Sequence, residues 1–161
     1  MSRLDLFIDR MVSQRACLNH AAELTKGLPG PVFELGLGNG RTYHHMCSIM
    51  PQGDIYVFER AVASHPDSTP PDAQVFLGDV FETLPAALAQ FGATVSLIHA
   101  DLGGHNAEKN DIFARRISPV IAPLLAPGGL MVSSDRMYFD DMTEIALPSD
   151  AVPGRCFIYQ R

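Results

Sequence analysis

Several features that define other protein classes are missing from this 161-residue sequence. No continuous hydrophobic stretch could serve as a signal peptide, and no segment is long enough to span a bilayer. Cys17, Cys47 and Cys156 are widely spaced and form no Cys-x-x-Cys pair, so we interpret them as reduced structural thiols. These absences predict a cytoplasmic protein that does not associate with membranes.

Strong basic character is missing as well. Lysine and arginine together number 12 against 18 acidic residues, which gives a formal charge of −6 and a pI near 5.4. The sequence has no run of five or more like charges and no low-complexity tract. Because nucleic-acid-binding proteins usually carry a basic patch, the charge argues against nucleic acid as a partner. The length suits one domain with a real core, so we expect residues 1–161 to form a single domain.

An amphipathic helix is predicted over residues 3–26, within an N-terminal segment (1–30) that covers one side of the core. Ser2 and Asp5 have the spacing of a capping box, and Gly27 ends the pattern. The apolar positions recur at helical spacing: Leu4, Phe7, Ile8, Met11, Leu18 and Ala22.

Short apolar runs then alternate with longer helical patterns, which predicts a mostly parallel sheet covered on both faces. The predicted strands are 32–35, 55–59, 74–77, 95–100 and 130–134, and the predicted helices are 42–49, 83–91 and 107–125, the last broken near Pro119 or Pro123. The tail contains "EIALP" and "GRCFIYQR", separated only by "SDAVP". Two strands joined by a short turn must be antiparallel, so we expect a C-terminal hairpin.

The glycines of "FELGLGNGR" predict a tight turn between the first strand and a helix. Gly36, Gly38 and Gly40 leave the backbone bare, so that a ligand can approach it. Arg41 occupies the place where the dinucleotide fingerprint needs its third glycine. Glu34 is costly to bury in the strand unless it meets a cation or hydrogen-bond donors. The turn therefore favours a ligand that carries positive charge, with a purely structural turn as the alternative.

Two further acids follow the next two strands. Glu59 ends the second strand, where a carboxylate can accept hydrogen bonds from both hydroxyls of a ribose. Asp79 follows the third strand and can reach an adenine amino group, with Val80 packing on the base. Three acids at successive strand ends, all beside the glycine turn, indicate one ligand site.

The motifs "FELGLGNG", "VFER", "LGDV" and "LLAPGG" together resemble those of class I S-adenosylmethionine-dependent methyltransferases, from Val32 to the C-terminus. The resemblance implies an α/β fold: a Rossmann-like three-layer sandwich with a seven-stranded, mostly parallel sheet of order 3-2-1-4-5-7-6 and an antiparallel C-terminal hairpin. It also implies S-adenosylmethionine as the cofactor, with Glu34 near its amino group and Arg41 a candidate for its carboxylate. The cofactor-binding residues that it implies are Glu34, Gly36, Gly38, Asn39, Gly40, Arg41, Glu59, Arg60, Gly78, Asp79, Val80 and Asp101.

Methyl transfer needs the acceptor aligned about 3–3.5 Å from the methyl group and one proton removed. Asp101 ends the fourth strand, where the family places residues between cofactor and acceptor. His105, on the following loop, is the candidate general base, with an exposed histidine of no function as the alternative. His99 is interpreted as a packed core histidine. His44 and His45 are adjacent on a helix and point in different directions, so we expect no shared metal.

Asp101 and Asp135 end neighbouring strands, and catechol-type O-methyltransferases, which the sequence also resembles here, use acids at these two places to hold a divalent metal. Those enzymes follow the second acid with Asn, whereas this sequence has Arg136, whose charge opposes a second cation. We therefore expect no metal, and Arg136 becomes a candidate for binding an anionic acceptor.

The acceptor is predicted to be a small molecule methylated on oxygen. No Asp/Asn-Pro-Pro-Tyr motif, the usual mark of amino methylation, follows the fourth strand. The short chain would leave a shallow cleft, which favours a homo-oligomer. A nicotinamide-dependent oxidoreductase, and a protein that binds the cofactor without turnover, are the alternatives.

Overall fold

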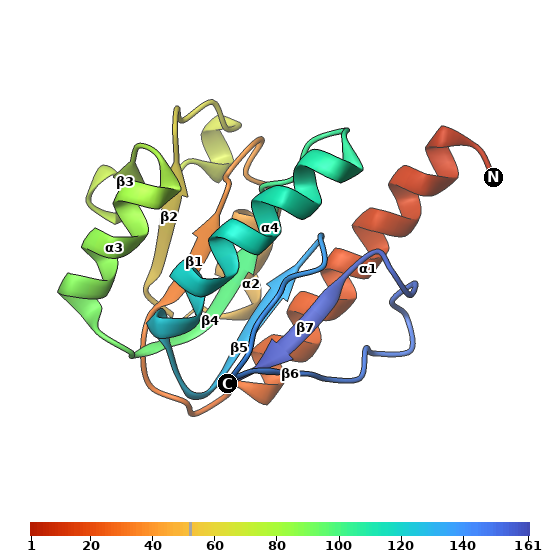
Figure 1. Ribbon diagram of the computed structural model, residues 1–161. Helices are drawn as coiled ribbons and strands as arrows, with labels where there is room; N and C mark the ends of the chain where they lie inside the picture. The colour runs from red at the N-terminus through yellow and green to blue at the C-terminus, as the bar shows by residue number, and fades with distance from the viewer. Residues whose placement is uncertain (52) are drawn as a thin grey trace.

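A computed structural model describes residues 1–51 and 53–161 of the protein (Figure 1). Its seven-stranded sheet has the order β3-β2-β1-β4-β5-β7-β6, which confirms the predicted topology. The strands are β1 (Val32–Leu35), β2 (Ile55–Glu59), β3 (Val75–Leu77), β4 (Val95–Ala100), β5 (Leu125–Ser133), β6 (Thr143–Glu144) and β7 (Phe157–Gln160). The strands β1 to β5 pair in parallel, whereas β7 pairs antiparallel with β5 and β6.

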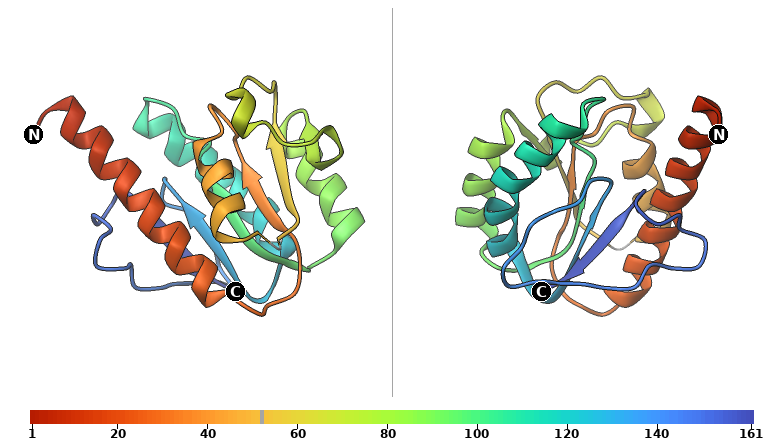
Figure 2. Two further views of the ribbon diagram at one scale, coloured as in Figure 1. Left: turned by 180° about the vertical axis from the view of Figure 1, so that it is seen from behind. Right: turned by 45° about the vertical axis from the view of Figure 1, so that its right-hand side comes forward.

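Helices cover both faces of the sheet, as Figure 2 shows. The α-helices are α1 (Arg3–Leu24), α2 (Arg41–Ile49), α3 (Val80–Phe91) and α4 (Ala107–Ile121), and the 3-10 helices are η1 (Pro66–Ser68), η2 (Asp72–Gln74) and η3 (Ala122–Leu124). One core lies between the sheet and α3 and α4, and the other lies between the sheet and α1 and α2. Burial on both faces explains why β4 is mostly apolar, with every one of its residues buried. No helix in the described part of the chain combines the length and hydropathy needed to cross a bilayer.

The capping box that begins α1 is confirmed. The Ser2 hydroxyl accepts the Asp5 N–H at 3.1 Å, and the Asp5 carboxylate accepts the Ser2 N–H at 2.7 Å. The prediction that the whole apolar stripe covers the core is wrong for the first half of the helix. Leu4, Phe7 and Ile8 are 65%, 50% and 48% exposed, because these turns project beyond the sheet (Figures 1 and 2).

The C-terminal hairpin is present, but its connection is longer than the sequence predicts. Only Thr143 and Glu144 form β6, and residues 145–156 lead from it to β7. This connection packs against α1, because Ala151 is buried in the α1 core and the Val152 N–H donates to the Ser13 hydroxyl at 2.9 Å. The prediction that "EIALP" forms a strand is therefore wrong beyond Glu144, because the rest of this segment belongs to a packed loop.

The connection between α4 and β5 differs from the prediction in its details. Pro119 lies inside α4, which continues to Ile121, and Pro123 lies in the 3-10 helix that follows. β5 begins at Leu125, before the predicted start at Leu130, and its register against β4 shifts between Val95 and Leu97. The break occurs at the second of the two candidate prolines.

Candidate active site

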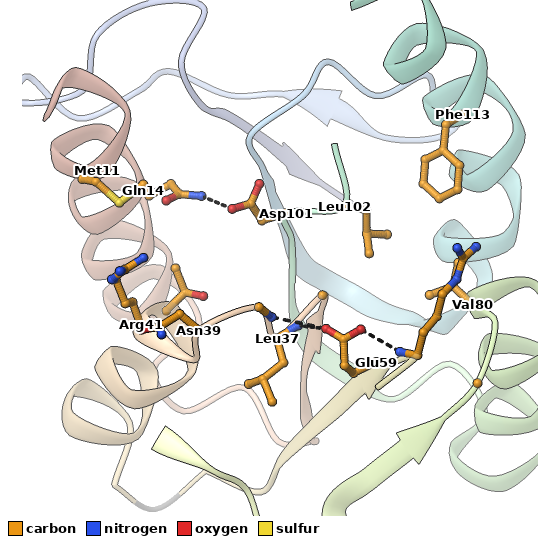
Figure 3. Close-up of a pocket in the computed structure, with 15 residues that line it drawn as sticks. Met11, Gln14, Leu37, Asn39, Arg41, Glu59, Val80, Asp101, Leu102 and Phe113 are labelled. Atoms are coloured by element: carbon orange, nitrogen blue, oxygen red, sulfur yellow. Dashed lines mark hydrogen bonds between the residues drawn. The ribbon is translucent and has the colours of Figure 1, made fainter. Parts of the chain in front are cut away.

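A cavity of about 500 Å³ opens at the carboxyl ends of β1, β2 and β4, where ligands bind in parallel α/β sheets. In Figure 3, Met11, Gln14 and Arg41 lie on one side of it and Val80 and Phe113 on the other. Nine of the twelve residues that the sequence assigned to cofactor binding line this cavity: Gly36, Gly38, Asn39, Arg41, Glu59, Arg60, Gly78, Val80 and Asp101.

The glycine turn lies at the base of the cavity, between β1 and α2. Gly36 has φ of +86°, and a Cβ at this position would lie 2.8 Å from the Asp101 carbonyl oxygen. Any side chain here would therefore push the turn away from the segment that follows β4. The glycine keeps the ends of β1 and β4 together, so that the turn and Asp101 face the same cavity.

Glu59, at the end of β2, fastens the glycine turn. Its Oε2 accepts the backbone N–H groups of Leu37 at 2.8 Å and Gly38 at 3.2 Å, and its Oε1 accepts the N–H of Arg60 at 2.7 Å (Figure 3). A carboxylate oxygen can accept more than one hydrogen bond, so both oxygens keep accepting capacity toward the cavity.

Asp101, just beyond β4, is held by residues from distant parts of the chain. Arg10 Nη2 donates to both carboxylate oxygens at 2.6 Å, Gln14 Nε2 donates to Oδ2 at 3.0 Å, and the Ser134 hydroxyl donates to Oδ1 at 2.7 Å. Burial would raise the pKa of Asp101, but the hydrogen bond from Ser134 and the charge of Arg10 outweigh it and lower that pKa. Asp101 is therefore a fixed anion.

Glu34 does not line the cavity. Its side chain is 0% exposed beneath the glycine turn, where Oε2 lies 2.6 Å from His99 Nδ1 and Oε1 accepts a hydrogen bond from the Thr42 hydroxyl. Thr42 does line the cavity, so Glu34 reaches the site only through this hydroxyl. The hydrogen-bonding partner that buried Glu34 requires is thus His99 in this structure, and a contact of Glu34 to the cofactor's amino group stays a prediction.

His99 is a buried core histidine, as predicted, and its partner Glu34 favours its protonated form. Burial alone would lower the pKa of His99; the charge of Glu34 and the hydrogen bond to it outweigh burial and raise that pKa. Among the described residues, His99 Nε2 has no hydrogen-bond partner.

Asp79 and Gly40 also fall outside the cavity lining, for local reasons. Asp79 is the N-cap of α3: its carboxylate accepts the Phe81 N–H at 2.9 Å and pairs with Arg60 at 2.9 Å. Gly40 caps α2 and faces η1, since a Cβ there would lie 2.6 Å from Ser68. The structure therefore brings Gly78 and Val80, but not Asp79, to the wall where the sequence expected an adenine.

His105 is exposed and lines neither this cavity nor the neighbouring one beyond Asp101, but it lines a third cavity, of about 260 Å³, together with Asp135 and Arg136. The cavity beyond Asp101 also has Asp135, whose pKa is raised by burial and by the charge of Asp101. Within the described residues, no group of three or more His, Cys, Asp or Glu side chains is arranged to hold a metal ion. Arg136 pairs with Glu144 at 3.1 Å and lies over the Phe157 ring.

The sequence did not identify several cavity residues. Those outside its predictions are Met11, Gln14, Leu37, Thr42, Leu102 and Phe113. Leu37 and Thr42 lie within the recognised glycine motif and could have been included with it. Met11 and Gln14 were assigned only to a covering helix, and no local signal shows that this helix reaches the carboxyl edge of β4.

The cavity suits a nucleoside joined to a charged amino acid. Glu59 offers a carboxylate for ribose hydroxyls, and Val80, Leu102 and Phe113 provide an apolar wall for a base. Asn39, Arg41 and Thr42 add polar groups on the side of α2. A mostly parallel sheet covered on both faces, with this site at its carboxyl edge, is the architecture of an α/β protein that binds a nucleoside cofactor.

Comparisons with known proteins specify the class further. A family described as S-adenosyl-L-methionine methyltransferase matches residues 1–161, and the chain belongs to this family. The crystal structure of an S-adenosyl-L-methionine methyl transferase from Silicibacter pomeroyi DSS-3 is 73% identical, with a TM-score of 0.98 over 100% of this chain and 99% of that one. The protein is therefore a methyltransferase, and its cofactor is S-adenosylmethionine. A search of curated proteins found no match to the sequence.

More distant structures share the fold. The O-methyltransferase TomG from Streptomyces achromogenes, solved with SAM, is 16% identical with a TM-score of 0.54, over 76% of this chain and 55% of that one. The methyltransferase MycE of the mycinamycin biosynthetic pathway, solved with Mg and SAH, is 16% identical with a TM-score of 0.53, over 88% of this chain and 44% of that one.

Proposed function

We propose that the protein transfers the methyl group of S-adenosylmethionine to a hydroxyl oxygen of a small molecule. One observation carries the proposal: Asp101 lines both the 500 Å³ cavity and a second cavity of about 250 Å³ on its other side. A cofactor in the first and an acceptor in the second would meet at this carboxylate. The fold neighbours TomG and MycE, one of them named as an O-methyltransferase, add support by analogy.

The cofactor supplies a methyl group on an already activated sulfonium, so the protein's tasks are alignment and proton removal. We propose that Glu59 accepts the ribose hydroxyls, that Gly78 and Val80 contact the adenine, and that Arg41 and Asn39 contact the amino-acid portion. Asp101 would orient the acceptor as a fixed anion. Its lowered pKa makes it a poor base, and the exposed His105 lies outside both cavities. Asp135, with its raised pKa, is the better candidate for taking the hydroxyl proton.

The test is the formation of S-adenosylhomocysteine by the purified protein with a panel of small alcohols, phenols and amines. We expect turnover with hydroxyl acceptors only. Asp135→Asn should lower kcat, whereas His105→Gln should leave it close to wild type. Turnover with amines alone would contradict O-methylation, and tight cofactor binding without turnover on any acceptor would favour the non-catalytic alternative. The family match removes the support for a nicotinamide-dependent oxidoreductase.

Homo-oligomer formation and a cytoplasmic location stay predictions. The exposed apolar residues Leu4, Phe7 and Ile8 on the projecting half of α1 favour self-association. Light scattering of the purified protein, compared with a Phe7→Ser/Ile8→Ser variant, would test this: we expect the variant to be smaller in mass.

A further inference from the structure

We propose that the acceptor carries an anionic group, a carboxylate or a phosphate, and that Arg155 binds this group with support from Arg10. The inference rests on the proposed function, because it names the substrate class of the same site. Its basis is the second cavity, which Asp101 separates from the cofactor cavity and which both arginines line.

Arg155 belongs to the connection between β6 and β7, which runs beside α1 (Figure 1). Its backbone is held on both sides. The Arg155 N–H donates to the Val152 carbonyl at 3.1 Å, the Val152 N–H donates to Ser13 of α1 at 2.9 Å, and the next residue, Cys156, is completely buried. A packed turn therefore fixes the base of the Arg155 side chain at the rim of the cavity, and a preorganised cation costs less entropy on binding than one on a free loop.

The Arg155 guanidinium has no ion pair or side-chain hydrogen bond within residues 1–51 and 53–161, yet it lines a cavity. Two other arginines, by contrast, are already paired. Arg115 contacts Asp111 at 2.9 Å and lies over Tyr138, and Arg136 contacts Glu144 and Phe157. Arg155 thus offers the planar, multiply donating group that matches carboxylates and phosphates.

Arg10 adds a second, partly used guanidinium. Its Nη2 holds both oxygens of Asp101, while its Nε and Nη1 make no hydrogen bond to any described residue. Asp101 is satisfied by Arg10, Gln14 and Ser134, so it does not compete for Arg155.

Asp135 is the remaining charged group in the cavity; it follows β5, whereas Arg155 precedes β7. Its Oδ1 accepts a hydrogen bond from Asn110 at 3.1 Å, and Gly103 gives it room, because a Cβ there would lie 2.0 Å from Oδ2. The cavity therefore presents a free guanidinium and a separate carboxylate. A small hydroxylated acid, with its anionic group on Arg155 and its hydroxyl toward the carboxylates, satisfies both.

This assignment replaces the one that the sequence suggested. Arg136 was the candidate for an anionic acceptor, but its charge is taken up by Glu144 and it does not line the second cavity. The two arginines therefore form a matched pair for an experiment, one free at the cavity and one paired outside it.

The experiment titrates benzoate, phenyl phosphate and the neutral benzamide into the protein saturated with S-adenosylhomocysteine, followed by calorimetry. We expect at least one anion to bind about 10-fold or more tightly than benzamide, and the stronger of the two identifies the preferred group. Arg155→Gln should abolish this preference and Arg136→Gln should retain it. Arg155→Lys keeps the charge without the planar fork and should retain part of it.

Affinity for S-adenosylhomocysteine, measured separately, should be the same in all four proteins, because Arg155 and Arg136 do not line the first cavity. Equal binding of anions and benzamide, no binding of either anion to the wild type, or an unchanged preference in Arg155→Gln would each overturn the proposal. Failure to bind S-adenosylhomocysteine would instead contradict the proposed function. The same anion titrations, carried out on the protein without S-adenosylhomocysteine, would then still test the role of Arg155.

Discussion

Glu34 and Glu59 are acids on neighbouring strands and on the same face of the sheet, yet they occupy different environments. In the β1–β2 register Glu34 lies opposite Val57, so Glu59 stands two residues nearer the carboxyl edge. That offset of about 6–7 Å decides what each acid does. Glu34 is sealed beneath the glycine turn with His99, whereas Glu59 reaches the rim and faces the cavity.

The two acids therefore belong to two kinds of site: Glu34 forms an interior pair with His99, and Glu59 is an acid at the rim of the cavity. The interior pair, Glu34 and His99, is completely buried, and the two side chains satisfy each other through a 2.6 Å hydrogen bond. The rim acid, Glu59, is bonded to backbone N–H groups and stays open to a ligand. We therefore expect changes in the interior pair to act on stability and changes at the rim to act on binding.

The largest expected effect is loss of stability when the interior pair is broken. Glu34→Leu or His99→Leu alone leaves a buried partner uncompensated and should lower the free energy of unfolding by about 3–5 kcal/mol. The double variant removes both charges and should be much less destabilised than the sum of the single variants. Urea denaturation followed by circular dichroism measures all four proteins. Additive effects would show that the two side chains are not coupled. Glu34 and His99 would then not form an interior pair that differs from Glu59 in its effect on stability.

The same pair predicts a pH dependence with a definite sign. Because the folded pKa of His99 is raised, the folded state binds the proton more tightly than the unfolded state. The stabilisation is fully present below the unfolded histidine pKa of about 6.5 and is lost as the pH rises through the folded pKa. The wild type should therefore lose stability over this range, and the double variant should show less of this loss in the same denaturation series.

The regular part of the fold could be predicted from the sequence because local signals mark it. β1, β2 and β4 have the predicted bounds, since each is a short apolar run between turn residues. The β6–β7 connection could not be predicted, because its order comes from packing on Ser13 and not from its own composition. Periodicity likewise identified α1 but could not show that nothing covers Leu4 and Phe7.

The residues of the site likewise fall into those that local sequence signals predict and those that depend on tertiary packing. Spacing along the chain was enough to predict Glu59 and most of the cavity-lining residues of the glycine motif. Glu34 has the same motif signal, but register against β4 places it opposite His99, and no spacing along the chain reveals that pairing. Arg10, Gln14 and Arg155 reach Asp101 or its cavity from either end of the chain, so only the assembled fold identifies them.

The next effect in size is at the rim. Glu59→Gln keeps an oxygen that can accept the turn N–H groups but loses the charge, and we expect S-adenosylhomocysteine binding to weaken by about 1–3 kcal/mol. Its free energy of unfolding should change far less than that of the interior variants. Calorimetric titration gives the affinity. The control is Glu23→Gln, which changes an exposed acid that does not line the cavity. An unchanged dissociation constant would show that Glu59 serves only to fasten the turn.

The smallest expected effect concerns Asp79, which stands at the rim by position but makes a structural contact. As the N-cap of α3 it accepts the Phe81 N–H at 2.9 Å, an interaction worth about 1 kcal/mol at such positions. Asp79→Ala should lose roughly this much stability, whereas Asp79→Asn should retain most of it, because asparagine caps as well as aspartate. Thermal and urea unfolding of the two variants provide the measurement. The two variants could instead be equally stable while both bind S-adenosylhomocysteine more weakly than wild type. That result would show that Asp79 contacts the cofactor, as the sequence predicts, and that it belongs with Glu59 among the acids that bind the ligand.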